Sequence, residues 1–324
     1  MNKYMLKKLS SSIIKLLIIF LTIILLMGCI DNGIVPHVKK WGIYSLDLST
    51  KKIDSIFSSD YEITTLRLNN NGDKFVFSMM INGSEYNNSE ICLLDLNGSN
   101  FNRLTKNNYW DLYPTWSPDD SNIAFLSFRE DDLDIYMMNS DGANQSKFYD
   151  SDSHDADIHW IDDKIVFTSG SKIWRINDDG TNPSIITNPS NAGEWGNANL
   201  PFGDYDPNIH PDGAKVVFER LENDTSPHGN YNIFSINLDG SDETRLTDNY
   251  ITQGFPTWSN SGKKILLLVT AKYNEGKYDL YMMNDDGSDY KNITPDYFPD
   301  RFLCHAGVFS PDDSLIYFVG EWWE

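Results

Sequence analysis

One short pattern returns six times along this chain of 324 residues. Each copy has an apolar or aromatic stretch, a turn similar to Asn/Ser-Pro-Asp-Gly and a β-branched strand, and the copy from Pro114 to Ser127 is the clearest. Taking one equivalent position as a marker, the copies are marked by Leu68, Trp116, Trp160, Ile209, Trp258 and Phe309. Successive markers are 48, 44, 49, 49 and 51 residues apart. This period is typical of the four-stranded blades of β-propellers.

Each copy has a second half that is as regular as its first. Apolar and polar residues alternate and end in Asp-Gly, as in Asp134–Gly142, and a short strand ending in Leu-Thr or Ile-Thr follows. Alternation followed by Asp-Gly predicts a hairpin, because glycine accepts the positive φ angle that the turn needs. Asn284–Asp289 resembles the start of an EF-hand loop, but the segment recurs in four copies and we interpret it as this turn. Each unit is therefore expected to hold four antiparallel strands.

The last copy stops after its second strand, at Tyr317–Val319. The missing half lies near the other end of the chain, where Gly42–Leu48 matches the third strand of the pattern and Lys52–Ile56 matches the fourth. The sequence therefore predicts an all-β fold, a six-bladed β-propeller of four-stranded antiparallel blades, whose last blade is closed by the N-terminal strands. Such closure leaves no free sheet edge. The six blades use all of residues 41–324.

The first 28 residues are predicted to lie outside this fold. Four lysines, at positions 3, 7, 8 and 15, come before the apolar run Leu16–Met27. This run is short for a membrane-spanning helix but has the length of the apolar core of a signal peptide. The run ends at Gly28-Cys29, which is similar to a lipobox, where a lipoprotein precursor is cleaved and the new terminal cysteine is acylated. We expect a signal peptide over 1–28, lipidation of Cys29 and a tether over 29–40. An uncleaved membrane anchor is the alternative.

The charge of the chain narrows the classes of partner. The sequence holds 47 acidic and 26 basic residues, and removing residues 1–28 takes away four lysines and no acid, which leaves a net charge of about −25. Such a charge argues against nucleic acid and against electrostatic docking on an anionic bilayer. With the signal segment, it predicts an exported protein anchored to the outer side of the cytoplasmic membrane.

The candidate site lies where the first strand of each blade begins. The positions five residues before the markers include Asp111, Asp155 and Asp204, with His154 and His305 nearby. We expect these residues to converge at the mouth of the central channel, where an oxygen-rich set would hold Ca²⁺ or another divalent cation. The alternative is that each aspartate caps a neighbouring loop. Aromatic residues are expected on the same face, namely Tyr109, Trp110, Trp195, Tyr205, Trp322 and Trp323.

These motifs resemble the WD40-like (PD40) propeller repeats of the TolB family, whose pattern runs Pro-x-Trp-Ser-Pro-Asp-Gly, then Asp-Ile-Tyr, then Asp-Gly and Leu-Thr. The resemblance covers residues 41–324. TolB itself carries an α/β domain before its propeller; in this chain we expect a lipid anchor in place of that domain. The role of TolB in its envelope system therefore does not follow from the resemblance.

Three functions remain open from the sequence, and one of them, a purely structural envelope protein that passes contacts between partners, differs from the favoured one only in the identity of its partners. The favoured one is a non-enzymatic, monomeric binding module at the cell envelope, which presents the loops of varying length on one face to a protein or a glycan. The alternative is a metal-dependent polysaccharide lyase that would use His154, His305 and the three aspartates around a divalent ion. No other cofactor is expected.

Overall fold

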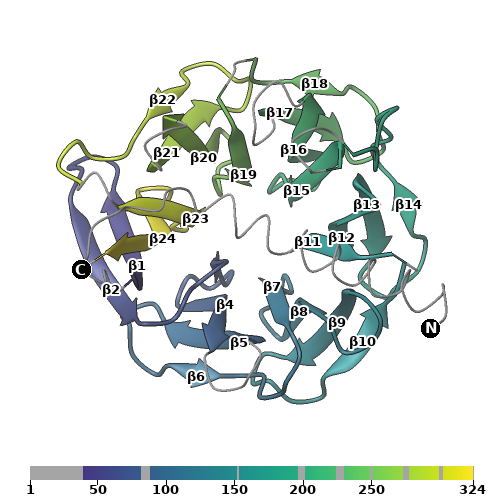
Figure 1. Ribbon diagram of the computed structural model, residues 1–324, viewed down its shortest axis with the longest axis horizontal. Helices are drawn as coiled ribbons and strands as arrows, with labels where there is room; N and C mark the ends of the chain where they lie inside the picture. Colours follow the sequence, from purple (N-terminus) through teal and green to yellow (C-terminus); the bar gives the residue numbers. More distant parts are fainter. Residues whose placement is uncertain are drawn as a thin grey trace, which may run out of the picture.

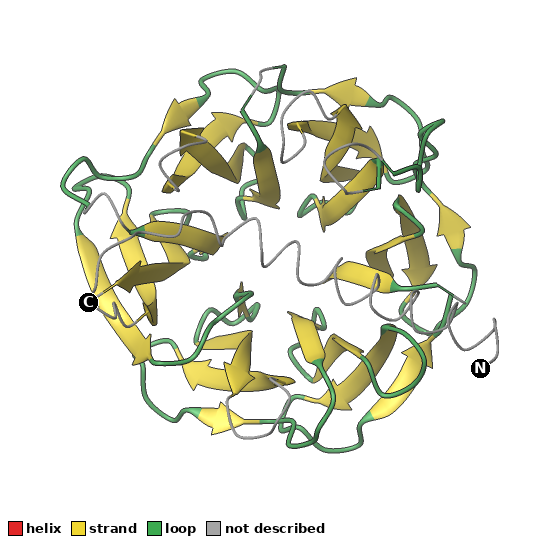
Figure 2. Ribbon diagram, in the orientation of Figure 1, coloured by secondary structure: helices red, strands yellow, loops and turns green. Residues whose placement is uncertain are grey.

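The computed structural model describes residues 39–81, 88–151, 153–195, 201–223, 230–248, 251–272, 277–298 and 302–323. In this part of the chain there are 24 strands and no helix, and the strands form six four-stranded sheets arranged around a common axis (Figures 1 and 2). The predicted six-bladed β-propeller is confirmed. The described residues contain no helix able to cross a membrane, and the predicted signal peptide over 1–28 and Cys29 lie outside them.

The first three blades follow one another along the chain, and in each the strands run in chain order from the innermost to the outermost. Blade 1 consists of β3 (Arg67–Leu68), β4 (Lys74–Ile81), β5 (Asn88–Asp95) and β6 (Asn102–Arg103). Blade 2 consists of β7 (Asp111–Trp116), β8 (Asn122–Ser127), β9 (Asp134–Asn139) and β10 (Ser146–Tyr149). Blade 3 consists of β11 (Asp155–Ile161), β12 (Lys164–Ser169), β13 (Lys172–Asn177) and β14 (Ser184–Ile185).

The remaining blades complete the ring. Blade 4 consists of β15 (Gly203–Ile209), β16 (Lys215–Asn223), β17 (Asn230–Asn237) and β18 (Thr244–Arg245). Blade 5 consists of β19 (Gln253–Trp258), β20 (Lys264–Lys272), β21 (Lys277–Asn284) and β22 (Lys291–Asn292). Blade 6 consists of β23 (Leu303–Phe309), β24 (Leu315–Trp323), β1 (Lys39–Asp47) and β2 (Ile53–Ser59).

Blade 6 is shared between the two ends of the chain, as the sequence predicts. Strand β1 pairs with β24 without interruption from Lys39 opposite Trp323 to Asp47 opposite Leu315. The innermost strand β23 also contacts β3 of blade 1, so neighbouring blades touch all the way around the ring. Because the pairing starts at Lys39, the last two residues of the predicted tether belong to the sheet rather than to the tether.

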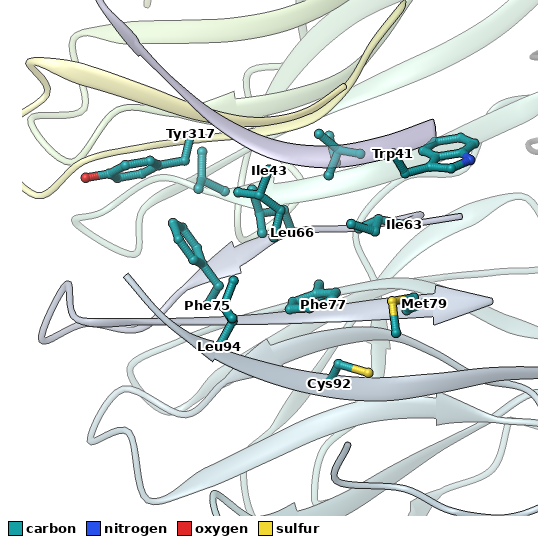
Figure 3. Close-up of a cluster of buried hydrophobic side chains, with 13 residues drawn as sticks. Trp41, Ile43, Ile63, Leu66, Phe75, Phe77, Met79, Cys92, Leu94 and Tyr317 are labelled. Atoms are coloured by element: carbon teal, nitrogen blue, oxygen red, sulfur yellow. The ribbon is translucent and has the colours of Figure 1, made fainter. Parts of the chain in front are cut away.

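The core lies between the blades, and the second strands contribute most to it, together with residues of the first and third strands. Each second strand carries at least one large side chain with no exposed surface, and these include Phe77, Phe125, Phe167, Phe218, Leu267 and Phe318. Figure 3 shows how Trp41 and Ile43 of β1 pack with Phe75 and Phe77 of β4, which joins blade 6 to blade 1. Burying an apolar side chain of this size stabilises the fold by about 1.5–3 kcal/mol. The cysteines Cys92 and Cys304 are buried and free.

The turn between the first and second strands of a blade also joins neighbouring blades. Where the repeat has glycine at the fourth position after the marker, blades 2 and 6 have Asp120 and Asp313, with φ angles of 59° and 58°. The Asp120 carboxylate accepts hydrogen bonds from the backbone N–H groups of Asn70 and Asn71 in blade 1, at 2.8 and 2.9 Å. Asp313 accepts two such bonds from the turn of blade 5. Each aspartate therefore couples two blades.

The other two repeated motifs have structural roles. In the segment that resembles an EF-hand loop, the Asn284 N–H donates to the carbonyl of Ser288 at 2.8 Å and Gly287 has a φ angle of 85°, so the prediction of a turn is confirmed. The threonine of the Leu-Thr motif accepts a hydrogen bond from the third strand of its blade. This bond joins Thr105 to the N–H of Ile91 at 2.9 Å, and its counterparts are made by Thr187, Thr247 and Thr294.

Candidate functional site

Three cavities follow one another along the axis of the ring. We call the face on which the innermost strands begin the loop face, and the opposite face, which holds the turns after the markers, the turn face. The cavity at the loop face, called the chamber below, has a volume of about 90 Å³. A second cavity of about 20 Å³ shares Tyr113, Phe255 and Ala306 with it. A third, of about 370 Å³, lies among the turns and shares Arg67 and Thr257 with the second.

The side chains of the channel are set by a bulge that recurs in the innermost strands. At equivalent positions Tyr113, Asp157, Asp206 and Phe255 have φ angles of 49°, 53°, 50° and 52°, and the ladder with the second strand shifts register there. The extra residue of a bulge turns its side chain out of the alternating pattern. Each such conformation costs roughly 1–3 kcal/mol, and strain of this kind clusters at functional sites.

Below the chamber, three carboxyl groups narrow the channel, and we call Asp157, Asp206 and Glu219 the acidic constriction. The backbone N–H of Asp206 donates to Asp157 at 3.3 Å, and that of Phe255 donates to Glu219 at 3.0 Å. The side chains of Asp206 and Glu219 are hydrogen-bonded to each other. The Arg67 guanidinium is close enough to both aspartates to interact with their charges.

Burial keeps protons on this constriction. It raises the pKa of Glu219 to about 8, with the charge of Asp157 adding to the effect and the bond from Phe255 opposing it. Burial likewise raises the pKa of Asp157 and, more strongly, that of Asp206, whose carboxyl also faces the charges of Asp157 and Glu219. Two neighbouring carboxyls that share a hydrogen bond hold at least one proton between them. At neutral pH the constriction therefore carries less negative charge than three free carboxylates.

On the turn-face side of the constriction lies His159. Its Nδ1 accepts a hydrogen bond from the backbone N–H of Ile209 at 3.0 Å, so this ring is neutral and has a structural role. Burial, with Arg67 nearby, lowers the pKa of His159 to about 3. His159 therefore joins blade 3 to blade 4 and is not a titrating group near neutral pH.

The chamber itself combines aromatic walls with carboxyl groups. Its aromatic lining consists of Trp41, Tyr113, Tyr231, Phe255, Tyr278 and His305. Glu62 lies at its rim, and burial, together with the charge of Glu321, raises the pKa of Glu62 to about 7. Although burial alone would raise the pKa of Glu321, its bonds to His305 at 3.1 Å and Lys39 at 2.7 Å hold that pKa below the ordinary value.

The three predicted aspartates begin their strands as expected, but each is buried and bound within its own blade. Asp111 bonds to Ser127 and Arg129, Asp155 to Ser151, and Asp204 to Arg220. Burial raises the pKa of Asp155 to about 8 and also raises that of Asp204, where Arg220 opposes the shift. None of the three lines the chamber.

The two predicted histidines lie on opposite sides of the ring, next to β11 and in β23 (Figure 1). His154 stacks on Phe128, and its Nδ1 accepts a bond from the N–H of Leu133 at 3.0 Å. His305 lines the chamber. The structure therefore does not bring the five predicted residues together, because each is fixed in a separate hydrogen-bond network. It does not supply the converging ligand set that the lyase alternative requires, and cation binding by these residues stays a prediction.

A separate cluster of three acidic side chains is close enough for its members to share an ion. Glu130, Asp134 and Asp150 have ligand atoms within 4.8 Å of one another, and no other such group occurs in the described part of the chain. Lys147 ion-pairs with all three, at 2.7, 2.9 and 3.0 Å. The lysine therefore occupies the position between the three carboxyl groups and offsets part of their charge.

The predicted aromatic residues separate into two groups. Tyr109 and Trp195 are 46% and 47% exposed. Tyr205 donates to the carbonyl of Pro201 at 2.8 Å, and Trp322 stacks on Phe302, so these two pack the structure. Trp110 is half-buried, and the side chain of Trp323 lies outside the described ones.

The sequence contained a signal for the channel residues that the prediction did not use. The bulge residues stand three positions before the markers, and there blades 3 and 4 carry the acids Asp157 and Asp206. The prediction took the residues just ahead of each first strand as the ring at the channel mouth and did not consider a departure from alternation within the strand. A bulge shifts that alternation by one residue, and regular patterning does not announce it.

Comparisons with known proteins bear on this fold. No family model matches the chain. An uncharacterized protein of Agrobacterium fabrum (strain C58 / ATCC 33970) is 28% identical over 192 residues, which are 55% of this chain and 61% of that protein. The chain thus spans less than two thirds of that relative. A putative TolB from Agrobacterium tumefaciens superposes with a TM-score of 0.67 at 17% identity, over 88% of this chain and 99% of that one.

The fold is a TolB-like propeller. TolB from Acinetobacter baumannii agrees, with a TM-score of 0.56 at 16% identity over 76% of this chain and 61% of that one. An oligogalacturonate lyase in complex with manganese is less similar to this TolB-like propeller, with a TM-score of 0.51 at 14% identity over 90% of this chain and 97% of that one. At these identities the similarity establishes the fold and leaves the activity to be argued from the site.

Proposed function

We propose that this TolB-like propeller is a binding module of the cell envelope that holds its partner on the loop face, over the chamber. The chamber carries the proposal: a cavity walled by aromatic rings, with carboxyl groups at its rim and floor, at the loop-face end of a closed ring. Concave, mostly apolar sites with a few convergent polar groups are where proteins bind ligands. The turn face also has a cavity, but the turns around it bond to one another across blades.

The point at which the tether joins the propeller supports this orientation. Strand β1 begins at Lys39 on the loop face, and Trp41, two residues later, lines the chamber. If Cys29 is acylated as predicted, the ten steps from Cys29 to Lys39 span at most about 35 Å. We therefore propose an exported lipoprotein whose loop face is turned toward the outer side of the cytoplasmic membrane. Its partner is a protein segment or a glycan that reaches into this space.

Site-specific photo-crosslinking in cells tests the proposal. A benzophenone amino acid at Tyr61, which is 37% exposed next to Glu62, samples the loop face, and the same group at the exposed Asp286 samples the turn face. The proposal expects one discrete crosslinked partner from position 61 and none from position 286. The same partner captured from position 286, or from both positions equally, would contradict the placement.

A further inference from the structure

We propose that the chamber binds an organic ammonium group, as a free amine or as the charged side chain of a peptide. The inference rests on the proposed function, because it names the chemistry of the group that enters from the loop face. It is carried by the aromatic walls, by an unpaired carboxyl and by an ammonium of the protein itself that already uses the same ring.

The walls of the chamber suit a soft cation. The rings of Trp41 and His305 lie 5.0 Å apart between centroids, and Tyr278 stacks on His305 at 6.2 Å. Tyr113 and Phe255, aimed into the channel by the bulge, close the chamber from the side of blades 2 and 5. The faces of aromatic rings are negative, and a group of rings attracts an alkylated cation that gives up its water more readily than a metal ion does.

The carboxyl group of Glu62 makes no ion pair with the described residues, although the charge of Lys39 reaches it and favours its ionised form. None of the residues that the structure describes hydrogen-bonds or ion-pairs with this side chain, although it is half-buried at the chamber rim. The other charged or titratable groups around it are Glu321, Lys39, His305 and Tyr278, and Glu219 lies at the floor of the chamber. Glu321 is already bound by Lys39 and His305. Glu62 is therefore available to an incoming positive charge.

The protein already places one ammonium against this chamber. The Nζ atom of Lys39 lies 5.9 Å from the centroid of the Trp41 ring and 2.7 Å from the Glu321 carboxylate. We expect the ammonium of the ligand to be held in the same way, by an aromatic ring and a carboxylate of the chamber. The carboxylate would then be that of Glu62 instead of Glu321. An anion would meet the opposite conditions, because the rim and floor are acidic.

Calorimetric titration of the full chain in detergent tests the inference with four probes. Choline presents a quaternary ammonium, cadaverine presents a primary one, and N-acetyl-lysine amide presents the side chain of a peptide. The fourth probe, 3,3-dimethylbutan-1-ol, has the shape of choline without its charge. We expect at least one cation to bind with a Kd below about 1 mM, and the neutral alcohol to bind at least tenfold more weakly, which corresponds to about 1.4 kcal/mol. The cation that binds best distinguishes a free amine from a peptide side chain.

Two variants locate the site, one serves as a control, and a fourth gives a result that a merely structural role would not produce. Glu62→Gln and Trp41→Phe are expected to lower the affinity for the best-binding cation at least fivefold. The control, Glu222→Gln, changes a residue of β16 that pairs with Arg245 and should leave this affinity unchanged. Lys39→Gln is expected to strengthen binding, because it removes a like charge. A bound cation favours the ionised form of the Glu62 carboxyl, so binding at pH 7 should release protons. Calorimetric titration in buffers of different ionisation enthalpy measures this release, and Glu62→Gln should reduce it.

Equal binding of choline and the neutral alcohol would overturn the inference in favour of a purely apolar pocket. The absence of binding by all three cations up to 20 mM (roughly the weakest range of specific binding) would overturn it as well. Neither result touches the photo-crosslinking at Tyr61. If the cations fail while position 61 still captures a partner, the ammonium chemistry is wrong and the binding face stands. If both fail, the proposed function fails with it.

Discussion

The buried carboxyls predict that this acidic protein loses stability as the pH rises from 5 to 9. Glu219 has the most informative environment, because its pKa rises from an ordinary value of 4.5 to about 8. The folded protein therefore binds a proton more tightly than the unfolded chain does. The resulting stabilisation is fully present below the unfolded pKa of 4.5 and is lost as the pH rises through 8.

The magnitude follows from the shift. One pKa unit corresponds to 1.36 kcal/mol. Glu219 shares a hydrogen bond with Asp206, so the two carboxyl groups titrate as one site. The free energy of unfolding should therefore fall by about 2–5 kcal/mol as the pH rises from 5 to 9. Glu62 and Asp155, whose pKa values are raised to about 7 and about 8, change stability in the same direction. Carboxylates such as Asp119, with a pKa lowered to about 2, act only below this window.

Urea unfolding of wild type and Glu219→Gln at pH 5, 7 and 9 isolates the contribution of this residue. Glutamine has the same shape and is neutral at every pH, so the variant should be more stable than wild type at pH 9 by about 2–4 kcal/mol and nearly equal to it at pH 5. Glu222→Gln, in the same strand but paired with Arg245 at the surface, should keep the wild-type slope. A Glu219→Gln slope equal to that of wild type would refute the reasoning.

Four further predictions concern the fold, the predicted cation site and the anchor. Asp120→Gly should lower the free energy of unfolding by about 1–2 kcal/mol in urea, because two bonds to the neighbouring turn outweigh the relief of backbone strain; no loss would contradict the coupling of blades. Phe318→Ala should cost about 3–5 kcal/mol and Phe101→Ala, 44% exposed, less than about 1 kcal/mol; equal losses would contradict the core. If the predicted cation site exists, calcium should bind in calorimetry more tightly than about 10 μM and lose affinity in Asp155→Asn; unchanged affinity would exclude Asp155. Cys29→Ser should abolish incorporation of labelled palmitate; persistent labelling would refute the lipobox.

The repeat made the architecture predictable from sequence, for a physical reason. Most blades use turn residues that accept a positive φ angle at the same positions, such as Gly72 and Gly287, and a similar alternation along their second and third strands. The strands missing after Val319 could be matched to Gly42–Leu48 and Lys52–Ile56 because a propeller must close. Local rules repeated six times leave little freedom for another arrangement.

The channel was less predictable, because its residues depend on a departure from the local rules. The aspartates Asp111, Asp155 and Asp204 were predicted at the channel mouth because they come at the start of the innermost strands, whereas the bulge directs Asp157 and Asp206 into the channel. Glu219 comes from a second strand, and Trp41 comes from the opposite end of the chain. Convergence of this kind depends on the closed ring and not on any spacing along the sequence.

The proposed function requires a partner that enters the chamber from the loop face, and two tryptophan variants test this requirement. Thr252 lines the chamber from a loop between blades, so Thr252→Trp would fill the chamber without disturbing a core strand, whereas Asp286→Trp adds the same ring to the turn face. We would measure, by biolayer interferometry, the affinity of both variants for the partner crosslinked at position 61. We expect Thr252→Trp to bind this partner at least tenfold more weakly than wild type and Asp286→Trp to bind it with wild-type affinity. Unchanged binding by Thr252→Trp would contradict the proposed function.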